Sequence, residues 1–197
     1  GPFGAITNTA NTSSAEANPN DPTKWTLGAS NQPGNGIVQK FKIIFNAPRL
    51  IEEKRYTLTT QIDGSVQGVK STTTSTYTDG TEALSSLTQV DATDRDAIYK
   101  DPVTQLTRKG LLKSYSSSIT SITKGIDAST TTAITTIRPQ DILIRLLQPL
   151  VLHQETTTTT TTPEGTTSNS IEALDFLYTR KGMRIAEGRV LLVPFHR

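Results

Sequence analysis

Blocks of threonine and serine are the feature that most constrains the fold of this chain. The 197 residues include 35 threonines and 16 serines, together about a quarter of the sequence. Threonine is branched at Cβ, which restricts its side chain and favours the pleated surface of a β-sheet. The hydroxyl-rich blocks near 71–78, 114–123 and 129–136 therefore indicate exposed strand faces rather than a disordered chain. Their irregular spacing does not indicate a repeat architecture.

Alternation of apolar and polar residues predicts several strands. Strands are expected over Ile37–Phe45, Arg55–Ile62 and Val66–Thr78, with further extended chain over 114–137. In the first strand, Phe41, Ile43 and Phe45 recur at every second position and are expected to face the core. An Asp-Gly turn signal follows the second strand and another follows the third.

Apolar residues at helical spacing predict a few short helices between the strands. The best candidate covers Pro139–Leu150, because proline suits the first turn of a helix. Leu143, Leu147 and Leu150 then fall on one helix face. The same spacing predicts shorter helices over 81–90 and 170–177 and a helical turn that opens at Pro102.

Two segments in the last quarter of the chain predict a loop and a hairpin. Seven consecutive threonines, Thr156–Thr162, run into a Pro-Glu-Gly turn without an apolar residue. This tract predicts a protruding Thr-rich loop over 156–168. After it, Met183–Ile185 and Val190–Val193 flank a glycine-containing segment and predict a hairpin.

These elements predict an α+β fold that is mainly antiparallel β, of the barrel or sandwich type, with a few short helices. Strands that come in runs, without long helices between them, favour antiparallel pairing over a parallel sheet. Residues 1–36 are rich in Gly, Asn, Pro, Ser and Thr and are expected to form an extended polar arm. Residues 37–197 are expected to form a single β-rich domain.

Apolar residues in the arm and near the C-terminal end are the candidates for contact with a partner. Phe3 and Trp25 stand in a polar arm, and aromatic side chains contribute strongly to protein interfaces. Trp25 is equally well interpreted as a cover for the chain's own core. Val190, Leu192 and Phe195 belong to an apolar segment that is expected to pair inside the sheet or to be offered to a partner as a strand.

Residue types that carry catalysis are sparse. The chain has no cysteine, and its two histidines, His153 and His196, are far apart in the sequence. Neither a Gly-x-Ser-x-Gly nucleophile elbow nor a phosphate-binding loop is present in the sequence. These observations favour a protein that is not an enzyme.

Four aspartates lie close together in the sequence: Asp91, Asp94, Asp96 and Asp101. Several carboxylates on a flexible loop are the ligands that calcium prefers. Their spacing does not match an EF-hand loop, and Gln105 stands where a bidentate glutamate is needed. A solvated linker is therefore the favoured interpretation, and no metal or cofactor is expected.

Charge and motif content favour a structural role. The formal net charge of +2 is small for a nucleic-acid-binding protein, and no apolar run is long enough for a membrane-spanning helix. The sequence predicts a non-enzymatic structural or assembly subunit, such as a capsid, tail, scaffold or linker component, whose partners are other protein subunits. The alternative is a β-barrel domain that binds a ligand or acts as an enzyme through a pocket the sequence does not reveal. A third hypothesis is adhesion through the Thr-rich loop.

Overall fold

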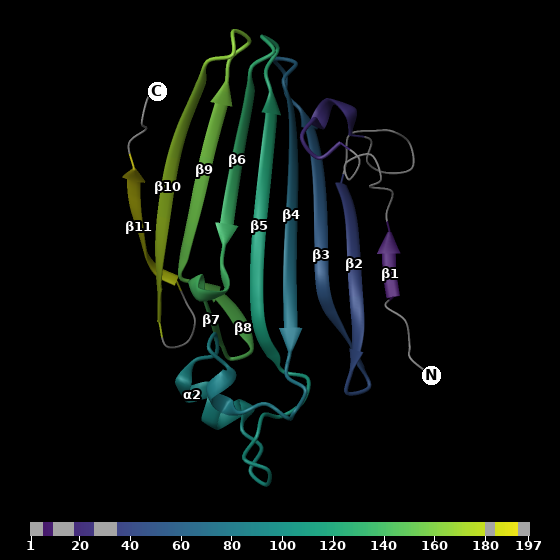
Figure 1. The fold of residues 1–197 in the computed structure, drawn as a ribbon, viewed down its shortest axis with the longest axis vertical. Coiled ribbons are helices and arrows are strands. Elements are labelled where there is room, and N and C mark those ends of the chain that lie inside the picture. Colours follow the sequence, from purple (N-terminus) through teal and green to yellow (C-terminus); the bar gives the residue numbers. More distant parts are fainter. Residues whose placement is uncertain (1–5, 10–17, 26–34, 180–183, 193–197) are drawn as a thin grey trace.

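Strands dominate the structure. The computed structural model describes residues 6–9, 18–25, 35–179 and 184–192. The strands of these residues are β1 (Ile6–Thr9), β2 (Asn35–Ile44), β3 (Ala47–Thr60), β4 (Val66–Tyr77), β5 (Leu112–Lys124), β6 (Thr130–Ile137), β7 (Ile142–Arg145), β8 (Gln148–Val151), β9 (His153–Thr161), β10 (Thr167–Tyr178) and β11 (Arg184–Leu192). One sheet has the order β1-β2-β3-β4-β5-β6-β9-β10-β11, and β7 pairs with β8 in a small second sheet (Figure 1). All of these neighbours pair antiparallel, which confirms a mainly antiparallel β fold.

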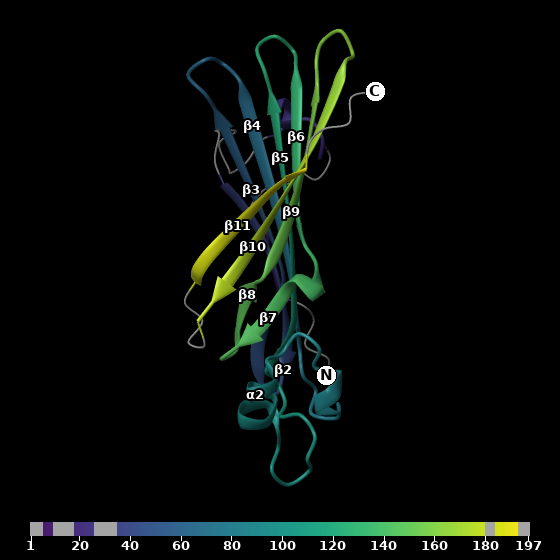
Figure 2. The same ribbon diagram turned by 90° about the vertical axis from the view of Figure 1, so that its left-hand side faces the viewer.

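The large sheet is open. β1 and β11 lie at its opposite edges (Figure 1), and Figure 2 shows the sheet nearly edge-on as a twisted layer. A barrel would require β1 to pair with β11, and a sandwich would require a second large sheet. The described strands form neither arrangement, so the barrel or sandwich type is not confirmed.

Helical segments in the described part of the chain are short. They are η1 (Pro22–Lys24), η2 (Leu84–Ser86), α2 (Ala92–Asp94), η3 (Arg95–Tyr99) and η4 (Pro139–Asp141). Of the helix predicted over 81–90, only the single turn η2 forms. The segment that follows Pro102 forms turns rather than the predicted helical turn.

The helix predicted over 139–150 is wrong beyond its first turn. After η4 the chain forms the hairpin β7–β8, with Leu146 and Leu147 as its two-residue turn. Ile142 and Ile144 bury one face of β7 at every second position. This period of two, which β-branched residues favour, outweighs the helical spacing of the leucines.

The helix predicted over 170–177 and the hairpin predicted over 183–193 are also wrong. Residues Thr167–Tyr178 form β10, which pairs with β9 on one side and β11 on the other. The expected hairpin turn, residues 186–189, lies inside β11. Pairing on both sides satisfies the backbone of β10, and this hydrogen bonding outweighs the local helical spacing.

The threonine tract is a strand and not a protruding loop. Thr156–Thr161 belong to β9, which lies between β6 and β10. Thr157 pairs with Ile134 on one side and Ile171 on the other. The turn comes after the tract, where Gly165 N donates to Thr162 O at 3.0 Å. Pairing with β6 on one side and β10 on the other therefore keeps the tract extended without apolar side chains.

The first predicted strand is confirmed, but its predicted core side is only partly buried. Phe41 is half-buried, whereas Ile43 and Phe45 are exposed. The pairing of β2 with β3 shifts register after Lys40, and β2 ends at Ile44. Phe45 therefore occupies a turn instead of a core position.

The two faces of the large sheet are here named the Trp25 face, which carries Tyr56 and Gly68, and the Tyr77 face opposite to it. On the Trp25 face, the ring of Trp25, the residue after η1, packs edge-to-face on the ring of Tyr56, with ring centroids 6.2 Å apart. A Cβ built on Gly68 would lie 2.7 Å from the Trp25 ring, so this approach requires glycine. Part of the predicted arm is thus packed on the sheet.

The main core, here called the lower core, lies where α2 and the β7–β8 hairpin meet the lower end of the sheet, and Figure 1 shows these elements. It consists of Leu87, Val90, Tyr99, Ile137, Ile142 and Ile144. Two connections supply most of it: residues 78–111 join β4 to β5, and residues 138–152 join β6 to β9. Backbone hydrogen bonds unite the connections, from Ile144 N to Gln89 O at 2.6 Å and from Asp91 N to Ile144 O at 2.9 Å.

Candidate functional site

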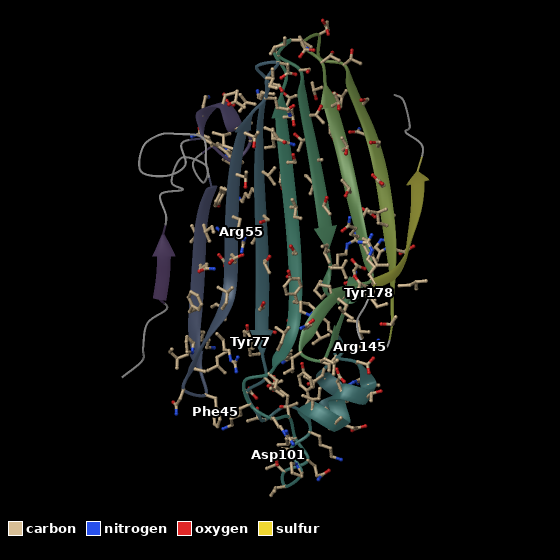
Figure 3. All side chains as sticks on the ribbon, turned by 180° about the vertical axis from the view of Figure 1, so that it is seen from behind. Phe45, Arg55, Tyr77, Asp101, Arg145 and Tyr178 are labelled. Atoms are coloured by element: carbon tan, nitrogen blue, oxygen red, sulfur yellow. The ribbon has the colours of Figure 1, made fainter. Side chains whose placement is uncertain are left out.

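A cavity of about 330 Å³, here called the Arg49 cavity, opens beside the lower core. Its lining comes from β3, β4, β5 and both lower connections: Arg49, Tyr77, Gly110, Tyr115, Leu147 and Pro149. Figure 3 shows Tyr77 and Phe45 toward the same lower end of the sheet. Aromatic and apolar walls around one cation are typical of a recognition site.

Arg49 is the one charged residue of this lining. Its guanidinium carbon lies 5.7 Å from the centroid of the Tyr77 ring, within range of a cation–π contact. The Tyr77 hydroxyl donates to Leu50 O at 3.0 Å, which fixes the ring. Arg49 Nε is buried without a hydrogen-bond partner, and the guanidinium forms no ion pair with any described residue. The cation is therefore held in place but not neutralised.

A second cavity of about 330 Å³ adjoins the first and shares Ser75 and Tyr77 with it. Its lining includes Lys42, Ile44 and Ile51. Lys42 is exposed and forms no ion pair with the residues that the structure describes. The two cavities are here together called the double cavity, and each carries one cation without an ion pair to a described residue. Strand alternation places Thr74 and Thr76 of the second cavity on the opposite face of β4 from Ser75 and Tyr77.

Glu52 is the one acid in the lining of the double cavity. Its Oε1 lies 2.9 Å from Lys40 Nζ and 4.0 Å from Lys54 Nζ. These two lysines neutralise the carboxylate, so it does not compensate the charge of Arg49 or Lys42. The electrostatic potential in the double cavity is expected to be positive.

Two turns, here called the apolar turns, flank the site at the lower end of the molecule. Phe45 and Asn46 join β2 to β3 with φ angles of 51° and 58°, and Leu146 and Leu147 join β7 to β8 with 51° and 64°. Two-residue hairpin turns with positive φ at both positions favour Asn-Gly. For other L-residues this left-handed backbone costs about 1–2 kcal/mol per residue.

The burial of the bulky side chains in the apolar turns is too small to offset this backbone cost. Phe45 is 74% exposed, Leu146 55% and Leu147 42%. A Cβ at Gly110 would lie 3.9 Å from Phe45 Cβ and 3.7 Å from Arg49 Nη2, so the first turn adjoins the Arg49 cavity. The stability of a single chain does not explain why these positions carry Phe and Leu.

An ion pair supports the second apolar turn from inside. Arg145 Nη2 donates to Asp91 Oδ2 at 2.7 Å, and its Nη1 donates to Thr179 O at 3.0 Å. Asp94 accepts a hydrogen bond from Leu146 N. The hydrogen bond from Arg145 lowers the pKa of the Asp91 carboxyl below its ordinary value.

The aspartate cluster is divided among structural roles. Asp91 and Asp94 bind the β7–β8 hairpin, as described above, while Asp101 accepts from Val103 N and Thr104 N, both at 2.9 Å. Asp96 is exposed. Among the described residues, no group of three or more His, Asp or Glu side chains is placed to hold a metal ion.

Of the histidines, His153 lies within the described residues. Its Nδ1 lies 2.7 Å from Asp175 Oδ1, across the directly paired strands β9 and β10. Both side chains are substantially exposed. His153 is the first residue of β9, so the pair lies on the surface at the end of a strand.

The structure places the five predicted partner-binding residues unequally. Trp25 is only 4% exposed, and its Nε1 donates to Asn18 O at 2.6 Å, as expected for a cover of the chain's own core. Val190 and Leu192 lie in β11 at the sheet edge, opposite Ala173 and Ile171 of β10. Phe3 and Phe195 lie outside the described residues. The structure does not bring Trp25 and the β11 residues together, since Trp25 packs on β3 and β4 while β11 lies at the edge of the sheet.

Sequence reasoning missed the double cavity and both apolar turns. Arg49 follows Pro48, where the first strand was expected to have ended, and Leu147 was assigned to a helix face. The turns carry Phe-Asn and Leu-Leu instead of Asn-Gly, so the usual hairpin signal is absent. The two-residue gap between two apolar runs was the one available signal.

No family model, curated protein or solved structure matches this chain. No helix formed by the described residues is long and apolar enough to cross a membrane.

Proposed function

We propose that this chain is a non-enzymatic structural or assembly subunit that binds other protein subunits through the apolar turns at its lower end. One observation carries the proposal: these turns hold bulky apolar side chains in water at a cost in backbone energy. Strained residues of this kind gather at functional sites. Contact with a partner would bury the side chains and offset the cost.

The balance of apolar surface supports an assembly role. Among the described residues, ten hydrophobic residues are buried and ten large hydrophobic residues are exposed. The exposed residues include Ile134 of β6 and Ile171 of β10, and both strands are paired on both sides. A sheet whose apolar positions are not covered by its own chain gains stability from a neighbouring layer. We propose that the second layer of a sandwich, which the sequence favours, comes from another subunit.

Within the part of the chain that the structure describes, β11 is paired on one side only, and this edge supports a second mode of contact. A strand at the edge of a sheet presents unpaired backbone donors and acceptors and is a template for another chain. We propose that the edge bearing Val190 and Leu192 contributes to assembly by adding a strand of a neighbour.

A ligand-binding domain is the second candidate function, favoured by the unpartnered Nε of Arg49 in its cavity. The cavity volume is near the lower limit of small-molecule sites. A thermal-shift screen of the whole chain separates the two candidates. A large stabilisation by a small molecule or metal would favour ligand binding.

Replacing one apolar turn by the preferred turn residues tests the assembly function. The double change Phe45→Asn with Asn46→Gly is expected to stabilise the single chain by about 1 kcal/mol, because it relieves strain. The same change is expected to reduce association, measured by size-exclusion chromatography with light scattering across a concentration series. The matched control is Ile62→Ser, which removes an exposed isoleucine at the opposite end of β3 and should leave association unchanged.

Two results would contradict the proposal. A wild-type chain that stays monomeric at every concentration is not an assembly subunit of this kind. A turn variant that associates like the wild type, or that is less stable than the wild type, shows that Phe45 serves the fold instead of a partner.

A further inference from the structure

We infer that β11 pairs with β11 of a second copy of this chain, antiparallel and about a twofold axis at Gly188. The inference rests on the proposed assembly function and names the neighbour that adds a strand at this edge. In such a dimer the two large sheets are continuous across the axis.

The two edges of the large sheet differ in length. β1 presents four residues, Ile6–Thr9, whereas β11 presents nine, Arg184–Leu192. From Ala186 to Leu192 the register of β11 with β10 is regular, and Figure 1 shows β11 on the outer side of β10. Within the described residues, the outer side of β11 pairs with no strand. A regular edge of this length is a template for another strand.

Glu187 and Arg189 flank Gly188 and give this edge a charge pattern that complements itself. A twofold axis perpendicular to the sheet runs the second strand antiparallel to the first, and it makes the contacts reciprocal. With the axis at Gly188, Glu187 stands opposite Arg189 of the second copy, and Arg189 stands opposite Glu187 of that copy. Ala186 and Val190 stand opposite each other in the same way. Opposite charges at directly opposed positions stabilise a strand pair.

The same charges select this register over its neighbours. Moving the axis by one residue to Arg189 sets Arg189 opposite its own copy and Glu187 opposite Leu191. Moving the axis to Glu187 sets Glu187 opposite its own copy. Like charges at directly opposed positions destabilise a strand pair, so the axis at Gly188 is the favoured one.

Strand β10 does not set opposite charges directly across from these two positions. The residues of β10 opposite Glu187 and Arg189 are Phe176 and Leu174, both apolar. A second β11 therefore gives both charged positions a directly opposed partner that β10 does not give. Gly188 is a further indication, because a glycine inside a strand often marks a place where another backbone approaches closely.

The test is charge reversal at this edge, read by size-exclusion chromatography with light scattering over a concentration series. Each change is made in the chain that carries Phe45→Asn with Asn46→Gly, so that the first apolar turn does not contribute. This background chain is expected to form a dimer of twice the mass of the single chain. Glu187→Arg and Arg189→Glu each set like charges opposite each other at two places. Each is expected to raise the dissociation constant of the dimer at least about tenfold at roughly 50 mM salt.

Two combinations are expected to restore the dimer. A mixture of Glu187→Arg chains with Arg189→Glu chains sets opposite charges at both contacts of a mixed dimer, and a chain that carries both reversals does so in its own dimer. Restoration also shows that the single variants are folded. The matched control is Glu164→Arg, which changes the net charge as Glu187→Arg does but lies in the exposed turn after β9. This control should dimerise like the background chain.

A monomeric background chain, an unchanged dissociation constant in either single variant, or failure of either combination to restore the dimer overturns the inference. Loss of the dimer in Glu164→Arg overturns it as well, because the effect is then one of net charge. The assembly function is judged on chains with an unaltered edge, namely the wild type and the turn variant. A wild-type chain that associates while reversal at β11 changes nothing therefore refutes the inference and leaves the assembly function standing.

Discussion

The lower core and the centre of the large sheet are stabilised in different ways. In the lower core, five apolar residues of the two connections pack with Ile137 of β6 at the end of the sheet. In the centre, around β6 and β9, threonines on both faces are half-buried and are joined by side-chain pairs such as Thr135 Oγ1 to Thr156 Oγ1 at 2.8 Å. We infer that β-branched hydroxyl residues are sufficient to keep the strands in the centre of the sheet extended. The burial of apolar side chains at the lower end of the molecule comes mainly from the two connections.

The largest expected effect on the free energy of unfolding comes from an isoleucine-to-alanine change in the lower core, compared with the same change in the centre of the sheet. Ile144 is fully buried in the lower core, whereas Ile134 of β6 is 43% exposed. Ile144→Ala is expected to lower the free energy of unfolding by about 3 kcal/mol, because it leaves a cavity. Ile134→Ala is expected to cost less than about 1 kcal/mol. Urea unfolding of both variants measures the difference.

Equal losses in these two variants would contradict the comparison. They would mean that the centre of the sheet is as well packed as the lower core in the chain as purified, for instance through a neighbouring subunit. Repeating the Ile134→Ala measurement at low protein concentration distinguishes this case, because a contribution from association falls on dilution.

An intermediate effect is expected from the ion pair in the lower end. Asp91 and Arg145 are largely buried, with side chains 18% and 21% exposed. Thr93 N donates a hydrogen bond to Asp91 Oδ1 at 2.9 Å. Asp91→Asn keeps an oxygen that accepts this hydrogen bond but removes the negative charge. The change is expected to cost about 1–2 kcal/mol near neutral pH.

The pH dependence of that loss has a definite sign. Because the pKa of Asp91 is lowered in the folded chain, its stabilisation is complete above the ordinary carboxyl pKa and disappears as the pH falls through the lower folded value. The stability difference between wild type and Asp91→Asn is therefore expected to shrink from about pH 6 to about pH 3. A difference that stays constant over this range would show that the charge of Asp91 is not what stabilises the hairpin.

The smallest expected effect lies in the centre of the sheet. Changing both Thr135 and Thr156 to valine keeps the branched side chains and removes only the hydroxyl pair. The expected change in unfolding free energy is within about 0.5 kcal/mol, because both partners become apolar together. Changing both to alanine removes the branch as well and is expected to cost about 1 kcal/mol. A larger loss in the valine variant than in the alanine variant would show that the hydroxyls, and not the branches, stabilise these strands.

The sequence was most informative where alternation was regular. The first three strands were predicted within a few residues at most ends, and the Asp-Gly turn after β3 lies where it was expected. β3 begins at Ala47, well before the predicted start at Arg55, because residues 47–54 pair with β2. Because this pairing depends on a neighbouring strand, residues 47–54 themselves show little alternation of apolar and polar residues.

Longer-range pairing also explains the wrong helices. The apolar residues of 170–177 have helical spacing, but β9 and β11 supply hydrogen bonds on both sides of the segment. Thr156–Thr161 carries no apolar pattern and became a central strand for the same reason. The double cavity was not predictable, because Arg49 and Leu147 meet only after two turns with positive φ have formed.

The way in which the lower core is divided between two connections has a thermodynamic consequence for binding. The Arg49 cavity is lined by Gly110 from the first connection and by Leu147 and Pro149 from the second. A partner bound in this cavity would contact both connections and would bind best when they are docked on each other. Binding and closure of the lower end are then linked equilibria, so each favours the other by the same free energy. Such a partner would hold together the two connections that form the main core.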